Sequence, residues 1–167
     1  MTFLLTLAFS GAWLLLAAGL IKLTRPSGTE PAVKALTGVR LATPLVRLLG
    51  LVEVAIATTA LTTPSVLSLG VLGAWYASLS GIAWVLFRDD TDCGCFGAKS
   101  TPVTRSHIVT TAILTGAALG SVLLDGGVSP QAASYVLAVA SLPIAIGWYA
   151  MLVPLPTLES ALRGRSS

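Results

Sequence analysis

Long stretches of this chain contain no charged side chain, and this limits the folds open to it more than any other feature. Only 10% of its 167 residues are Asp, Glu, Lys or Arg, against about 25% in an ordinary soluble domain. A soluble fold needs charged side chains to face water over its whole surface. The sequence therefore predicts an integral membrane protein in contact with membrane lipid, not a soluble or nucleic-acid-binding one.

Five apolar segments approach the length needed to cross a bilayer. About 20 apolar residues, each rising about 1.5 Å, span a hydrocarbon core of about 30 Å. The predicted spans are residues 2–21, 45–61, 65–87, 107–124 and 132–153. Because backbone polar groups in lipid must be satisfied internally, these segments predict an all-α polytopic helical bundle. Pro143 is expected to kink the fifth span, and Gly116 and Gly120 form a GxxxG candidate contact on the fourth.

The basic residues all fall on one side of a five-span topology. They lie in the first and third connections and in the C-terminal tail, whereas the other side has none. The positive-inside rule then places the N-terminus outside a cell membrane, and the basic connections and the tail in the cytoplasm. The ten residues are Lys22, Arg25, Lys34, Arg40, Arg47, Arg88, Lys99, Arg105, Arg163 and Arg165.

The connection between the third and fourth spans holds both cysteines, in the sequence Cys93-Gly94-Cys95-Phe96-Gly97. Glycine between two thiols allows the sharp backbone turn that a disulfide there requires. So small a ring lies near the edge of disulfide geometry, and it should be readily reduced. This pattern favours a redox-active pair, with Cys93 and Cys95 as the catalytic thiols.

Two other interpretations of this connection stay open. Asp92 and His107 could join the two cysteines around a metal ion, although zinc sites usually show two well-spaced ligand pairs. Alternatively, the cysteines only pack or form a static bridge in a glycine-rich turn. The preferred prediction has no metal, and it treats His107 as a helix-start residue that faces the membrane interface.

A carboxylate lies near the middle of the second span. Ionised Glu53 in hydrocarbon would cost several kcal/mol, and such residues usually face the bundle interior. Glu53 could relay protons, bind a quinone head group, or pair with a cation and so fix helix packing. Lys22 is the candidate partner if the first helix is adjacent. A solute carrier that uses Glu53 is a further alternative, but the chain lacks the internal repeats common in transporters.

Several of these features together resemble the MauE family, the methylamine-utilisation membrane proteins grouped with the DoxX-like proteins. The pentapeptide at residues 93–97, after the third apolar span, looks like the signature of that family. Lys22-Leu23 at the end of the first span, Glu53 in the second and Arg105 before the fourth resemble further family elements. The resemblance covers residues 1–125.

This resemblance implies a four-helix core at residues 1–125, related in shape to quinone-linked thiol oxidoreductases. Residues 126–167 would add a fifth transmembrane helix and a short cytoplasmic tail. It also implies a thiol–disulfide role in maturing, or supplying electrons to, a partner such as a thioredoxin-like protein or a membrane complex, with quinone as a candidate cofactor. The alternative is a non-catalytic accessory or scaffold subunit of a larger membrane complex. The implied site comprises the thiols Cys93 and Cys95, an intramembrane polar pair of Glu53 and Lys22, and the supporting residues Gly94, Phe96, Gly97, Arg105 and His107.

Overall fold

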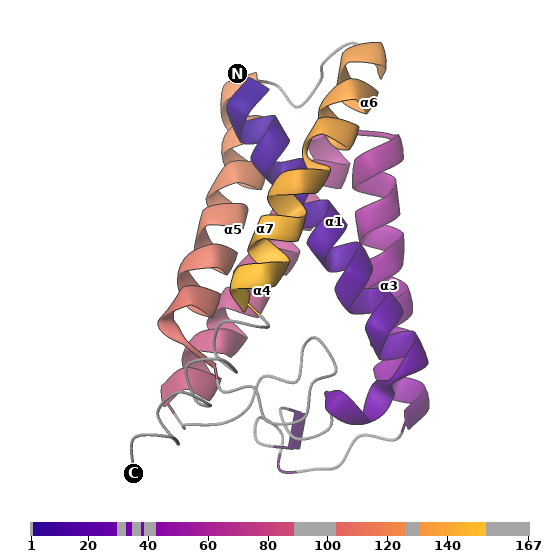
Figure 1. The fold of residues 1–167 in the computed structure, drawn as a ribbon, viewed down its shortest axis with the longest axis vertical. Coiled ribbons are helices and arrows are strands. Elements are labelled where there is room, and N and C mark those ends of the chain that lie inside the picture. The colour runs from indigo at the N-terminus through magenta and orange to yellow at the C-terminus, as the bar shows by residue number, and fades with distance from the viewer. Residues whose placement is uncertain are drawn as a thin grey trace.

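The computed structural model describes residues 2–29, 33–34, 38, 43–88, 103–125 and 131–152, which form a bundle of helices (Figure 1). The four long helices are α1 (Thr2–Thr24), α3 (Thr43–Thr62), α4 (Val66–Arg88) and α5 (Arg105–Asp125). Each of them is long and apolar enough to cross a membrane. A 3-10 turn, η1 (Pro26–Gly28), follows α1, and two shorter helices, α6 (Gln131–Ala140) and α7 (Leu142–Leu152), follow α5. The described residues contain no strand, so the predicted all-α membrane bundle is confirmed.

The predicted fifth span is not one long helix, because it divides at Ser141 into α6 and α7. Pro143 explains the break, since it has no backbone N–H to donate to the preceding turn. Beside the break, the Ala138 carbonyl accepts hydrogen bonds from Ser141 Oγ at 2.7 Å and from Trp13 Nε1 of α1 at 2.9 Å. Side chains commonly satisfy backbone groups at such breaks in membrane helices. The two helices still run back along the bundle across α1, in the direction of a fifth span (Figure 1).

Helix α1 holds the bundle together. It packs most extensively against α3 and also contacts α5, α6 and α7, while α4 packs mainly against α5. Helices α3 and α4 are consecutive but contact each other little, and they diverge toward the end of the bundle where α1 terminates (Figure 1). The side chains of Phe9, Leu15, Leu69, Leu72 and Leu114 are almost completely buried where these elements meet.

Helices α1 and α3 come close enough for their backbones to touch at a pair of glycines. A Cβ atom on Gly19 would lie 2.8 Å from the carbonyl oxygen of Gly50, and a Cβ on Gly50 would lie 2.8 Å from that of Gly19. Small residues permit such close crossings between membrane helices. Within the chain, Gly120 of the predicted GxxxG pair packs against Leu4 of α1, whereas a Cβ on Gly116 would meet no described atom within 4 Å. A dimer contact through this pair stays a prediction.

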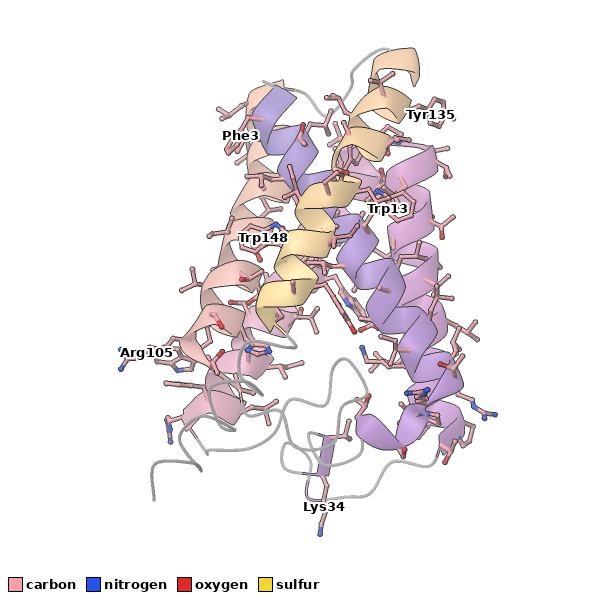
Figure 2. All side chains as sticks on the ribbon, viewed as in Figure 1. Phe3, Trp13, Lys34, Arg105, Tyr135 and Trp148 are labelled. Carbon is pink, nitrogen blue, oxygen red and sulfur yellow. The ribbon has the colours of Figure 1, made fainter. Side chains whose placement is uncertain are left out.

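The described basic residues lie at one end of the bundle. Lys34 and Arg105 mark this end in Figure 2, while Phe3 lies at the opposite end. The other described basic residues lie near the C-terminal ends of α1 and α4 and near the N-terminal end of α3. These three helix ends lie at the same end of the bundle as Lys34 and Arg105. The set is Lys22, Arg25, Lys34, Arg47, Arg88 and Arg105, of which all but Lys22 are exposed.

A methyl group at Gly19 should force α1 away from α3. We expect Gly19→Ala to destabilise the purified protein by about 1–3 kcal/mol, the usual cost of overpacking, and to lower its thermal unfolding temperature in detergent. Gly70→Ala is the matched control, because a Cβ there meets nothing within 4 Å and alanine has the higher helix propensity. Equal unfolding temperatures for Gly19→Ala and Gly70→Ala would contradict the close crossing.

Candidate intramembrane polar site

Lys22 and Glu53 form a buried ion pair between α1 and α3. Nζ of Lys22 donates hydrogen bonds to Oε1 of Glu53 at 2.7 Å and to Oε2 at 2.6 Å. The two side chains are only 5% and 1% exposed, so the pair lies inside the protein and not in lipid. Burying either charge alone would carry a large free-energy cost of desolvation. The attraction between the two opposite charges offsets that cost. The structure thus brings together the two residues that the sequence analysis placed in one polar site.

The two glycines at the helix crossing make room for this ion pair. Gly19 and Gly50 each lie three residues before the charged residue of their own helix, and this spacing puts both on one helix face. A Cβ on Gly50 would lie 3.1 Å from Cβ of Lys22, and a Cβ on Gly19 would lie 3.1 Å from Cβ of Glu53. Each charged side chain therefore starts opposite a glycine of the other helix. The matching patterns Gly-x-x-Lys and Gly-x-x-Glu are a sequence signal that hydropathy analysis does not use.

The ion pair borders a cavity of about 70 Å³ in the interior of the bundle. Side chains of α1, α3, α4, α5 and α7 line it, and most of its wall is aliphatic. A space of this size holds on the order of a few water molecules or one small polar group. The polar residues in its wall are Lys22, Glu53, Tyr76, His107, Thr110 and Thr111.

Tyr76 fastens α4 to α1 at one side of the cavity. Its buried hydroxyl donates a hydrogen bond to the Gly11 carbonyl at 2.6 Å. Gly11 gives the ring space, because a Cβ there would lie 3.2 Å from Cε2 of Tyr76. The indole N–H of the neighbouring Trp75 lies near Glu53 and has no hydrogen-bond partner in the described part of the chain. Sequence reasoning did not single out Tyr76, because an aromatic residue in an apolar span shows its facing direction only once the neighbouring helices are known.

His107 lies in the first turn of α5, as expected for a helix-start residue. Its backbone N–H donates to the Thr104 carbonyl at 3.0 Å, while its Nδ1 accepts from the Thr104 backbone N–H at 3.3 Å. His107 thus satisfies the Thr104 N–H as the Glu or Gln of a capping box does, although its own N–H bonds the Thr104 carbonyl and not the Thr104 hydroxyl. The expectation that His107 faces the interface is wrong, because it is only 7% exposed and lines the cavity. Because the Thr104 N–H can only donate, its contact with Nδ1 favours the tautomer with the ring hydrogen on Nε2.

The predicted redox segment lies outside the described residues. The positions concerned are Cys93, Gly94, Cys95, Phe96 and Gly97. Both flanks are described: Val103 packs with Ala83 and Leu86 near the end of α4. Arg105, the first residue of α5, points outward from the bundle (Figure 2). The two ends of this segment are therefore held beside each other at the basic end of the bundle.

The metal interpretation also falls largely on residues that the structure does not describe, including Asp92. Within the described ranges, no three or more His, Cys, Asp or Glu side chains lie close enough together to hold a metal ion. His107 is thus the one proposed ligand whose position is known, and its Nδ1 is engaged with Thr104.

The fold and this site define a polytopic helical membrane protein with a Lys–Glu pair beside a mostly apolar interior cavity. The family model described as "Methylamine utilisation protein MauE" matches residues 1–124. The chain belongs to the MauE family, as the resemblance in its sequence indicated. The match ends at the last turn of α5, so α6 and α7 follow the matched region. No curated protein and no solved structure matches the chain.

Removing one partner of the ion pair should cost more stability than removing both. We expect Lys22→Met and Glu53→Gln each to lower the free energy of unfolding, Lys22→Met by about 3–5 kcal/mol, because it leaves an unpaired buried carboxylate. The double variant should recover much of that loss, since no unpaired charge remains buried. Arg47→Met, which removes an exposed charge of α3, is the control. Denaturant titration in detergent measures the effect, and a double variant less stable than Lys22→Met would refute the coupling.

Proposed function

We propose that this protein is a membrane thiol–disulfide oxidoreductase that supports the maturation of, or electron transfer to, a partner protein. The observation that carries the proposal is the buried Lys22–Glu53 pair beside a cavity. Charged residues inside a membrane bundle are costly to keep and usually mark functional sites. Membership of the MauE family supports the same conclusion.

The cysteine segment is tethered to the end of the bundle nearest this site. Cys93 follows Arg88, the last residue of α4, by five positions, and Cys95 precedes Arg105, the first residue of α5, by ten. His107, two residues into α5, lines the cavity. The short connections on both sides support a link between the thiols and the intramembrane site.

The proposed reaction is thiol–disulfide exchange with a disulfide of the partner protein. A thiolate of Cys93 or Cys95 attacks one sulfur of that disulfide, breaking its S–S bond and forming a mixed disulfide. The second cysteine then attacks the mixed disulfide and releases the partner as a dithiol. Two electrons and two protons pass to the partner, and the reverse sequence oxidises a partner dithiol. A strained two-cysteine ring suits such exchange better than structural stapling.

A quinone ring does not fit the cavity as the described side chains define it. Its volume is about 70 Å³, whereas a cavity that accepts benzene measures about 150 Å³. The cavity would have to expand before it could hold a ring beside Lys22 or Glu53. We therefore assign the two-electron exchange to the partner protein and route no step through a quinone.

The redox state of the cysteine pair should follow the surrounding thiol pool. In membranes equilibrated with glutathione buffers, a mass-tagged maleimide should label two thiols under reducing conditions and none under oxidising ones. Cys93→Ser and Cys95→Ser should each leave one thiol, and the double variant none. A wild-type pair that stays in one state across the buffers, with partner maturation intact in the double variant, would favour the non-catalytic scaffold subunit instead.

The basic end of the bundle is proposed to face the cytoplasm, with the N-terminus outside. An impermeant maleimide applied to intact cells should then fail to label reduced Cys93 in the Cys95→Ser variant, and should label it after permeabilisation. Thr63→Cys in a background without Cys93 and Cys95 is the control, because Thr63 is exposed at the opposite end of the bundle. Labelling of Cys93 in intact cells would place the thiols outside, where stable disulfides form.

A further inference from the structure

An apolar groove on the outside of the bundle adjoins the interior cavity. The groove lies between α1 and α7 and has a volume of about 530 Å³. Its walls are aliphatic and aromatic, from Trp13 at one end to Ile21 and Tyr149 at the other. Leu20 and Ile146 in these walls are 48% and 61% exposed on helices that cross or line the membrane. In a membrane, this surface would face the hydrocarbon chains of the lipids.

The side chain of Leu14 separates the groove from the cavity. Among the described lining residues, it alone borders both spaces, and it is only 4% exposed. Helix α7 also borders both, through Leu152 on the cavity side and Ala145 on the groove side. A chain lying in the groove would therefore end one side chain away from the polar wall of the cavity.

The polar wall offers hydrogen-bond donors without net charge. Lys22 and Glu53 neutralise each other, and the ammonium group uses two of its three N–H bonds on the carboxylate. His107 keeps its Nε2–H free of the cap that engages Nδ1. These side chains are more than nine-tenths buried, at 4% exposure for Lys22 and 7% for His107. The matching ligand group is an uncharged hydrogen-bond acceptor.

The cavity volume limits the size of that acceptor. At about 70 Å³, the space is less than half of the roughly 150 Å³ of an engineered cavity that binds benzene. A hydroxyl or carbonyl group fits this volume once the side chain of Leu14 has turned aside. A phospholipid head group or an aromatic ring does not.

We propose that groove and cavity together bind a single-chain lipid with a small uncharged oxygen head. The hydrocarbon chain lies between α1 and α7, and the head oxygen accepts a hydrogen bond from Nε2 of His107 after Leu14 turns aside. This site goes beyond the thiol–disulfide role, because binding needs neither cysteine. It gives the intramembrane polar site a ligand class of its own.

The test uses the full chain in phosphatidylcholine nanodiscs and a diazirine-bearing hexadecanol as the probe. Photolabelling should fall on α1 and α7 and be saturable. Unlabelled hexadecanol should compete with the probe better than three other compounds. Hexadecane lacks a head group, palmitate has a charged one, and decylbenzoquinone carries a ring. A competitor series in which hexadecane equals hexadecanol, or in which palmitate or the quinone competes best, would overturn the proposal.

Variants separate the parts of the site. His107→Ala should weaken hexadecanol competition about three- to tenfold, as expected for one lost hydrogen bond, and leave hexadecane unchanged. Leu14→Trp should block entry to the cavity, and Ala17→Leu should fill the groove without entering the core. Leu123→Trp is the control, because Leu123 is 81% exposed on α5.

The double variant Cys93→Ser/Cys95→Ser distinguishes this site from the redox proposal. It should abolish thiol exchange and keep wild-type photolabelling. Saturable labelling that persists unchanged in both Leu14→Trp and Ala17→Leu would show that the probe binds elsewhere. That result would overturn the lipid proposal regardless of the outcome of the thiol-exchange experiment.

Discussion

The two hydrogen bonds from Lys22 to the carboxylate of Glu53 tie the fold to the site. Neither charge can be exposed to hydrocarbon without a cost of several kcal/mol, so α1 and α3 cannot separate or rotate freely. The pairing also depends on Gly19 and Gly50, which let the two backbones meet where the charged side chains cross. The helix pair is thus fixed in register, and the other helices assemble on α1, which contacts α5, α6 and α7 as well.

The same arrangement explains why a cavity persists beside the ion pair. Helix α4 packs on α5, where Gly73 lies against Leu119, and Tyr76 holds α4 to α1 through the Gly11 carbonyl. Because α3 and α4 contact each other little, their side chains do not fill the space between the α1–α3 pair and the α4–α5 pair. Aliphatic side chains and His107 line what remains of that space.

Hydropathy predicted the helical bundle, and charge placement predicted the shared end of the six described basic residues. Lys22 was the candidate partner of Glu53 on the condition that their helices are adjacent, which α1 and α3 meet. The glycine contact was missed because a GxxxG search looks for two glycines on one helix, whereas this crossing takes one from each of two helices. Burial of His107 could not be read from its position at a helix start, since a first-turn residue faces water or protein according to its neighbours. The kink at Pro143 was predicted, but the division of the span into α6 and α7 was not. The hydrogen bond from Trp13 to the Ala138 carbonyl beside this break joins segments far apart in sequence.

The packing that holds the flanks of the cysteine segment does not involve its thiols. Packing of Val103 against Ala83 and Leu86, with the contacts between α4 and α5, holds both flanks of residues 89–102 together without help from a disulfide. A disulfide stabilises a fold mainly by restricting the unfolded chain, and this effect shrinks with the number of residues in the closed ring. A Cys93–Cys95 bond would close a ring with only Gly94 between the two cysteines, so it should add little to the stability of the bundle. Formation or reduction of that bond should therefore leave the stability of the bundle nearly unchanged, as the proposed thiol exchange requires.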